Sequence, residues 1–229
     1  MLWSRPTHNN NTQVTPLSQP AMSSTTPPVS APFQVSTTGL LDVLLLTPTA
    51  SLPANPSQAE LQTAFGLATG KLVQLVEQRQ LPLQANQLVG LRYQLPPHVH
   101  GSLVQATQGR VFVAVADIRK FSPAFGQWTS VELSPSQPQY LWLPPGLAVG
   151  YLGLAAGSNV CLHHTGAHSA KHERAIVWND PDLCINWPTT GKPQLTAADQ
   201  RGQFFSWWSM PKDSTFGGAG ADGHSQFGA

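Results

Sequence analysis

One arginine stands in the middle of LVGLRYQ, an apolar run at residues 88–94 with the length and composition of a β-strand. Alternation would place Arg92 on the same face as Leu88 and Gly90. Arginine stays protonated at neutral pH and has only N–H donors, so it suits an ion pair or an anion rather than proton abstraction. Three roles are therefore open for Arg92: a pair with a carboxylate inside the fold, an anion contact such as a phosphate, and a contact with an acidic partner chain.

Two histidines in PPHVHG, His98 and His100, have the His-x-His spacing of metal-binding cupins, and imidazole binds several transition metals. The usual further ligands are a glutamate a few residues on and a third histidine after the P-x-G turn. Gln105 and Val149 occupy those places. Solvent-exposed loop and strand histidines are the simpler interpretation, so no metal or other cofactor is predicted, and a metal-binding cupin stays an alternative.

The elements that position these residues are short alternating runs separated by Gly, Pro and Ser, which fill residues 88 to about 187. Strands at this spacing predict a sandwich or a barrel. Residues 57–79 predict a helix, because Ser57 and Glu60 form an S-x-x-E capping box and apolar residues recur at helical spacing. Pro82 follows the expected end of this helix.

Charged residues make up only 10% of the 229 residues, and the net charge is +1. This balance gives no basic surface for nucleic acid or for an anionic membrane. The longest apolar run is too short for membrane insertion. Cys161 and Cys184 lie in apolar contexts, which predicts buried, reduced thiols and a cytoplasmic location. The N-terminus has no apolar segment of the secretory type.

Both ends of the chain differ from the middle. Residues 1–38 are rich in Ser, Thr, Pro, Asn and Gln and predict an extended or disordered arm. Residues 200–229 begin aromatic and become Gly-rich. Aromatic side chains dominate protein interfaces, so those of the two tails are the interface candidates: Trp3, Phe204, Phe205, Trp207, Trp208, Phe216 and Phe227.

The middle of the chain contains three motif-rich blocks: VFVAVADIRKFSPAFGQW (111–128), ELSPSQPQYLWLPPGLAVGYLGL (132–154) and ERAIVWNDPDLCINWP (173–188). They are similar, in the same order, to D-I/L-R-x-x-S-P-x-F-G-x-W, L-S-x-x-N-x-x-x-L-x-I-P-x-G-F-A-H-G-F and E-x-G-I-x-W-N-D-P-x-L-x-I-x-W-P. Through these motifs the chain resembles the dTDP-4-dehydrorhamnose 3,5-epimerase family. The resemblance implies a mainly β, jelly-roll (cupin-like) sandwich over residues 39–199, with one N-terminal helix and extended tails, and it implies a homodimer.

The same resemblance implies a base, an acid and a cation around a sugar nucleotide. The family's L-R-G-L-H-Y/F-Q aligns with LVGLRYQ, so its basic histidine falls on Arg92. The lysine of Q-G-K-L-V falls on Ser102, the histidine of G-F-A-H-G on Val149, and the tyrosine acid on Leu162. The carboxylate partner is retained as Asp199, which is also the expected partner of Arg92.

These replacements predict a protein without catalytic residues, because the loss of even one general acid or base costs about 10²–10⁴-fold in rate. The predicted function is therefore a pseudoenzyme that serves as a scaffold or linker subunit. Its partners would be other protein subunits of a large complex, bound through the tails. A photosynthetic antenna is one fitting setting, although no residue selects it. The alternative is a sugar-nucleotide epimerase with altered or residual activity that uses Asp199 as its base.

Overall fold

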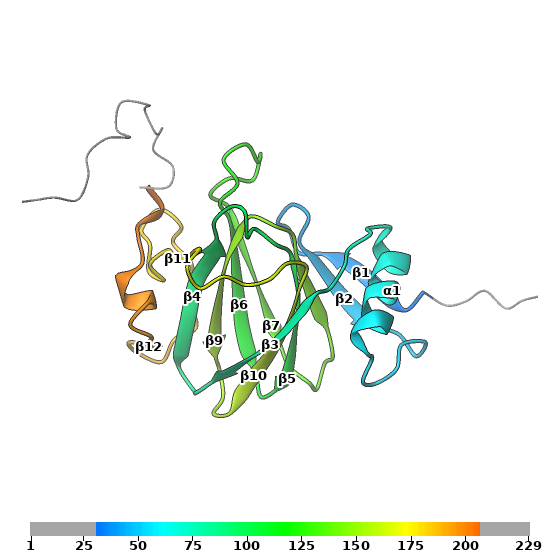
Figure 1. The fold of residues 1–229 in the computed structure, drawn as a ribbon. Helices are drawn as coiled ribbons and strands as arrows, with labels where there is room; N and C mark the ends of the chain where they lie inside the picture. Colours follow the sequence, from blue (N-terminus) through cyan, green and yellow to red (C-terminus); the bar gives the residue numbers. More distant parts are fainter. Residues whose placement is uncertain (1–30, 207–229) are drawn as a thin grey trace, which may run out of the picture.

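The computed structural model describes residues 31–206, which form two stacked β-sheets (Figure 1). The first sheet has the order β1-β2-β8-β5-β10-β3, and the second has the order β11-β4-β9-β6-β7 with β12 beside β4. The strands of the first sheet are β1 (Phe33–Thr37), β2 (Leu44–Pro48), β8 (Tyr140–Leu143), β5 (Ser102–Gln108), β10 (Ser158–His164) and β3 (Glu77–Leu83). The strands of the second sheet are β11 (Glu173–Ala175), β4 (Gln87–Gln94), β9 (Leu147–Gly153), β6 (Val111–Asp117), β7 (Trp128–Leu133) and β12 (Gln194–Leu195).

All strand pairs are antiparallel except β12 with β4. The main core lies between the sheets, where Val104 and Val160 of the first sheet pack with Val113 and Val115 of the second. A second cluster covers the outer face of the second sheet and includes Phe205. The predicted mainly β jelly-roll sandwich with one N-terminal helix is confirmed.

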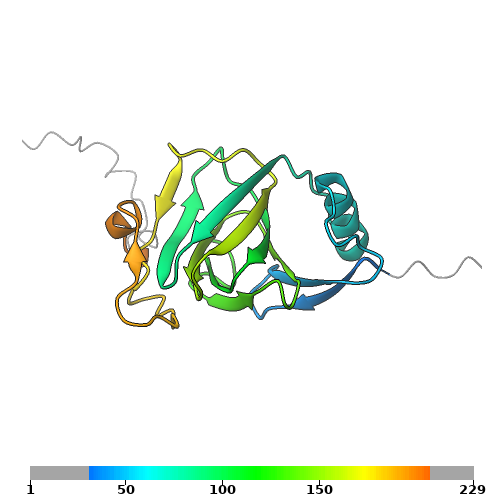
Figure 2. The same cartoon turned by 90° about the horizontal axis from the view of Figure 1, so that it is seen from below.

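The helix is α1 (Gln58–Thr69), which packs on the outside of the first sheet at one flank of the sandwich (Figure 2). Its predicted capping box is present, with Ser57 and Glu60 bonded to each other's backbone N–H. The predicted end at residue 79 is wrong. Gly70 adopts a left-handed conformation with φ 69° and ends the helix, because glycine enters that region without steric cost. The chain then becomes β3, which contains Pro82 at the edge of the sheet.

The predicted tail boundaries need correction at both ends. Residues 33–37 of the expected N-terminal arm form β1, which pairs with β2. At the other end, Phe205 is only 6% exposed, and its backbone N–H donates to Asp180 Oδ2 at 2.7 Å. The domain therefore includes residues that the sequence assigned to the C-terminal tail.

Arg92 does not share a face with Leu88 as simple alternation predicts. The register of β4 against β9 shifts between Val89 and Arg92, so one irregularity reverses the alternation within the strand. Gly90 lies in this irregularity with φ 113°, and a Cβ there would collide with the carbonyl oxygen of Val149. The shift turns Arg92 toward the space between the sheets.

Both cysteines are free thiols, but their environments differ. Cys161 is buried as predicted, whereas Cys184 is exposed, so the prediction of two buried thiols is wrong for Cys184. Within residues 31–206, the helices are too short or too polar to cross a membrane.

Candidate active site

A cavity of about 140 Å³ lies between the two sheets. All four positions at which the resemblance places replaced catalytic residues line it: Arg92, Ser102, Val149 and Leu162. They come from β4, β5, β9 and β10, so strands of both sheets bring together residues that are distant in the sequence. The resemblance therefore indicated residues that line this cavity, although other polar side chains line it as well.

Arg92 pairs with Asp199 in the arrangement that the sequence suggested. Its Nε donates to Asp199 Oδ1 at 2.8 Å and its Nη2 to Asp199 Oδ2 at 3.0 Å. Its Nη1 donates to Glu173 Oε1 at 3.1 Å. Burial alone would lower the pKa of Arg92, but the hydrogen bonds and negative charges of Asp199 and Glu173 outweigh burial and raise it. Arg92 is therefore a fixed cation at the cavity wall.

Asp199 begins the short 3-10 helix Asp199–Arg201 and has a fully buried side chain. Besides Arg92, it accepts the backbone N–H of Gly90 at 3.1 Å and the hydroxyl of Thr196. Both carboxylate oxygens are thus occupied, and Asp199 does not line the cavity. The alternative in which Asp199 acts as the base is not supported by this geometry.

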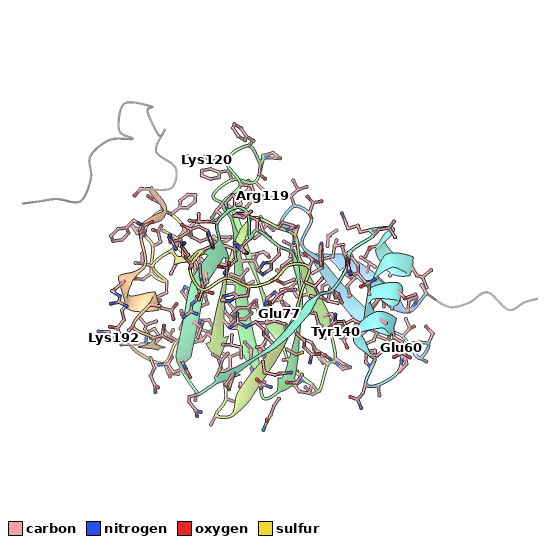
Figure 3. The ribbon with its side chains drawn as sticks, viewed as in Figure 1. Glu60, Glu77, Arg119, Lys120, Tyr140 and Lys192 are labelled. Carbon is pink, nitrogen blue, oxygen red and sulfur yellow. The ribbon has the colours of Figure 1, made fainter. Side chains whose placement is uncertain are left out.

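His168 and Glu173 form a pair at the cavity that sequence reasoning missed. His168 Nε2 lies 2.7 Å from Glu173 Oε2, and both residues line the cavity. The backbone N–H of His168 donates to Glu77 Oε2 at 2.7 Å, and this bond lowers the pKa of Glu77. Figure 3 places Glu77 near the middle of the domain. A signal for Glu173 existed in the sequence, since it opens the block ERAIVW, whereas His168 stands in no motif.

A neutral phenol and a second cation line the same cavity. Tyr151 of β9 is 8% exposed, and burial raises its pKa, so the phenol keeps its proton at neutral pH. Arg79 of β3 has a side chain that is 43% exposed, and its closest carboxylate is that of Glu77 at 3.8 Å. The cavity therefore holds a proton donor and a cation that still has solvent access.

The two weak metal candidates do not converge on a common point. His100 Nδ1 lies 2.9 Å from the backbone carbonyl of His98, and its ring packs against that of His164 instead. No group of three or more His, Cys, Asp or Glu side chains within residues 31–206 is placed to hold a metal ion.

The interface candidates divide into three groups. Trp3, Trp207, Trp208, Phe216 and Phe227 lie outside the described residues. Phe204 is 55% exposed and stays a prediction. Phe205 is wrong as an interface candidate, because it packs against Phe125 at 5.1 Å between ring centroids and belongs to the core on the outer face of the second sheet.

The fold and the cavity define a jelly-roll domain with a polar site between its sheets. Comparison with known proteins matches residues 56–212 to the family described as dTDP-4-dehydrorhamnose 3,5-epimerase. The chain therefore belongs to this family.

Individual relatives agree with that assignment. The chain is 38% identical over 145 residues to the dTDP-4-dehydrorhamnose 3,5-epimerase of Pseudomonas aeruginosa, a match that covers 63% of this chain and 80% of the relative. It is 34% identical to the Escherichia coli K12 enzyme of the same name, over 61% of this chain and 76% of the relative. A dTDP-6-deoxy-D-glucose-3,5-epimerase from Legionella pneumophila, solved with dTDP-4-keto-L-rhamnose, superposes with a TM-score of 0.68 at 27% identity, covering 76% and 93% of the two chains.

These relatives correct the prediction of function. The replaced residues led us to expect a non-catalytic linker or scaffold subunit. The chain instead matches, over most of their length, proteins that are named as epimerases. The pseudoenzyme interpretation is therefore wrong. Its physical weakness was the assumption that a pocket must do its chemistry from the same positions, whereas His168, Glu173 and Tyr151 bring polar groups into the cavity from others.

Proposed function

We propose that the protein is a sugar-nucleotide epimerase of this family whose proton-transferring residues have moved within the pocket. Its substrate would be a dTDP-linked 4-keto-6-deoxy sugar, the class of compound named for its relatives. The observation that carries this proposal is the His168–Glu173 pair at 2.7 Å in the cavity between the sheets. A histidine held by a carboxylate is a common general base.

In this proposal His168 removes a proton from the carbon next to the keto group. With Nε2–H donating to Glu173, the lone pair is on Nδ1, and the imidazolium formed by protonation is stabilised by the carboxylate. The electron pair of the broken C–H bond moves into the enolate. Tyr151 then returns a proton to the opposite face of that carbon, which inverts it, and both residues regain their starting states by exchange with water.

The cations have separate roles. Arg92 has five N–H groups, and its hydrogen bonds to Asp199, Glu173 and Thr196 use four of them, which leaves one on Nη1. We assign this N–H to the enolate oxygen, where a preorganised donor stabilises developing charge. Arg79, which is more exposed, would contact the diphosphate. The cytoplasmic location of this enzyme stays a prediction.

The proposal is tested by substitution of the base. His168→Gln keeps a hydrogen-bonding side chain of similar length but has no proton acceptor of suitable basicity. Epimerisation of the substrate, followed by NMR, should fall about 10²–10⁴-fold relative to the wild type. Gln139→Ala, a change at a part-buried residue that bonds Thr47 of β2, is the control and should keep wild-type turnover. Wild-type turnover by His168→Gln, or no turnover by the folded wild type, would contradict the proposal.

A further inference from the structure

Three histidines line the cavity, His100, His164 and His168, and two more, His98 and His172, lie in the segments that border it. His98 and His100 belong to the 95–101 segment, which joins β4 to β5, and His168 and His172 belong to the 165–172 segment, which joins β10 to β11. His164 ends β10. The 165–172 segment crosses from the first sheet to the second (Figure 1), and the two segments contribute Val99, His100 and His168 to the cavity lining.

One ring pair and backbone hydrogen bonds join the two segments, and a second ring pair joins the 95–101 segment to the end of β10. The rings of His98 and His172 have centroids 4.4 Å apart, and those of His100 and His164 are 4.5 Å apart. The N–H of Leu95 donates to the carbonyl of His172 at 2.9 Å, and the N–H of Thr165 donates to the carbonyl of Gly101 at 2.9 Å. These contacts hold one wall of the cavity in place.

The charged groups near the two ring pairs do little to stabilise protonated rings. The titratable and charged groups that face the five histidines come from four places: Glu77 and Arg79 on β3, Arg92 and Tyr93 on β4, Glu173 and Arg174 on β11, and Lys171 in the turn before it. Glu173 is taken by His168 and Arg92. His98, Lys171 and Arg174 lie near His172, and all three disfavour its protonation. Glu77 favours protonation of His100 and His164, but Arg79 and His168 oppose it.

Protonation is therefore expected to weaken the joined arrangement. Burial is the largest cause that lowers the pKa of His164, to about 4, and burial also lowers the pKa of His100. The pKa of His172 is lowered by desolvation and by its cationic neighbours. Groups whose pKa is lowered in the closed arrangement are neutral there and bind protons more readily when released. The closed arrangement is thus stable above a pH of about 6.5, the ordinary histidine value, and loses stability as the pH falls below it.

We propose that the 95–101 and 165–172 segments form a pH-sensitive gate of the cavity, closed by the contacts of the two ring pairs and opened when His100, His164 and His172 take up protons. Protonated His100 and His164 repel each other at 4.5 Å between ring centroids, and protonated His172 is repelled by Lys171 and Arg174. Separating the segments relieves this repulsion. The gate does not depend on the proposed reaction, because its opening is visible in the backbone of the protein without substrate.

Amide hydrogen exchange measured by NMR on the full chain at pH 7.5, 6.5 and 5.5 tests the gate directly. The amides of Leu95 and Thr165 report on it, and the amide of Val113 in the β6–β9 ladder serves as the reference. After correction for intrinsic exchange, protection at the two reporter amides should fall by up to about tenfold per pH unit for each proton taken up on opening, while the reference stays protected. Equal protection at all three pH values, or a loss shared by the reference, would overturn the proposal.

Variants identify the rings that are responsible. His98→Gln and His172→Gln each remove the same ring pair from the opposite side, so both should flatten the pH dependence at Leu95 by the same factor. His163→Gln is the matched control, since His163 contacts Cys161 and belongs to neither pair; the wild-type pH dependence should persist in it. If His163→Gln does not fold, the agreement between the other two variants still decides the question. Unchanged pH dependence in both would refute the role of the ring pair.

Discussion

Two arginine–aspartate pairs of this domain have nearly the same local form but differ in what they connect. Arg92 and Arg119 are 27% and 26% exposed, and each binds, through two nitrogens, a carboxylate that is fully buried. Arg119 reaches back only two residues to Asp117 and holds a turn at the upper end of the domain (Figure 3). Arg92 reaches across 107 residues to Asp199 and fastens the C-terminal part of the domain to β4.

The two pairs also differ in the further side chains that each one contacts. The carboxylate of Asp117 also accepts the hydroxyl of Ser122, and Arg119 Nη1 lies 3.6 Å from Asp42 Oδ2 in the turn between β1 and β2. Arg92 instead binds Glu173, and Glu173 binds His168. The Arg119 pair therefore stabilises turns of the domain, whereas the Arg92 pair extends through Glu173 to His168 at the cavity. The form of an ion pair thus says little about its role until its further contacts are known.

The sharpest contrast is expected for Glu173→Gln, which removes the negative charge from beside His168 while keeping the shape of the side chain. Without the carboxylate the imidazolium is not stabilised, so epimerisation should slow by about 10²–10⁴-fold. Glu132→Gln, at an exposed carboxylate 2.7 Å from Arg110 Nε, is the matched control and should be as active as the wild type. Equal activities of the two variants would show that the carboxylate of Glu173 matters no more for the reaction than an exposed carboxylate outside the cavity.

Asp199→Asn tests the long-range connection. It removes the buried carboxylate that binds two nitrogens of Arg92 and leaves Glu173 as the remaining carboxylate partner, and it weakens the bond to the Gly90 N–H. We therefore expect unfolding in urea to show a loss of about 3 kcal/mol. Asp117→Asn should cost less, because its pair bridges only a turn. A larger loss for Asp117→Asn would mean that the span of the pair does not determine its contribution.

The pH dependence of the free energy of unfolding tests how much the charge of Asp117 contributes to the Asp117–Arg119 turn. Burial tends to raise the pKa of Asp117, but the hydrogen bonds from Arg119 and Ser122 outweigh burial and lower it. A lowered carboxyl pKa adds stability above the unfolded value near 4, and this stability is lost as the pH falls through the lower, folded value. The stability difference between the wild type and Asp117→Asn should therefore shrink between pH 6 and pH 2.5. A constant difference would show that the charge of Asp117 is not responsible.

The smallest effect is expected for the exposed pair of Arg110 and Glu132, whose side chains are 60% and 45% exposed. Solvent screens such a pair, so Arg110→Gln should change the free energy of unfolding by only about 0–1 kcal/mol. Thermal or urea unfolding measures this directly. A loss as large as that of Asp199→Asn would show that burial does not determine how much an ion pair contributes to the stability of this domain.

Much of the fold could be predicted from the sequence, because alternation, turn residues and the Ser57–Glu60 capping box are local signals. The end of α1 and the orientation of Arg92 could not. The first depends on the backbone conformation of Gly70, and the second on a register shift in β4, and neither leaves a periodic pattern. The positions that line the cavity were found through the resemblance. His168 was missed, because its role comes from Glu173, which β11 places beside it, and from no motif of its own.

The central claim is that this pocket transfers protons at a carbon next to a keto group. The most direct test incubates the wild-type protein with the dTDP-linked 4-keto-6-deoxy sugar in D₂O and observes C3 and C5 by NMR. The account predicts deuterium incorporation at one or both carbons, and at least 10²-fold slower incorporation with His168→Gln, by about the factor that one general base contributes. No incorporation above the protein-free rate with folded wild-type protein would contradict it.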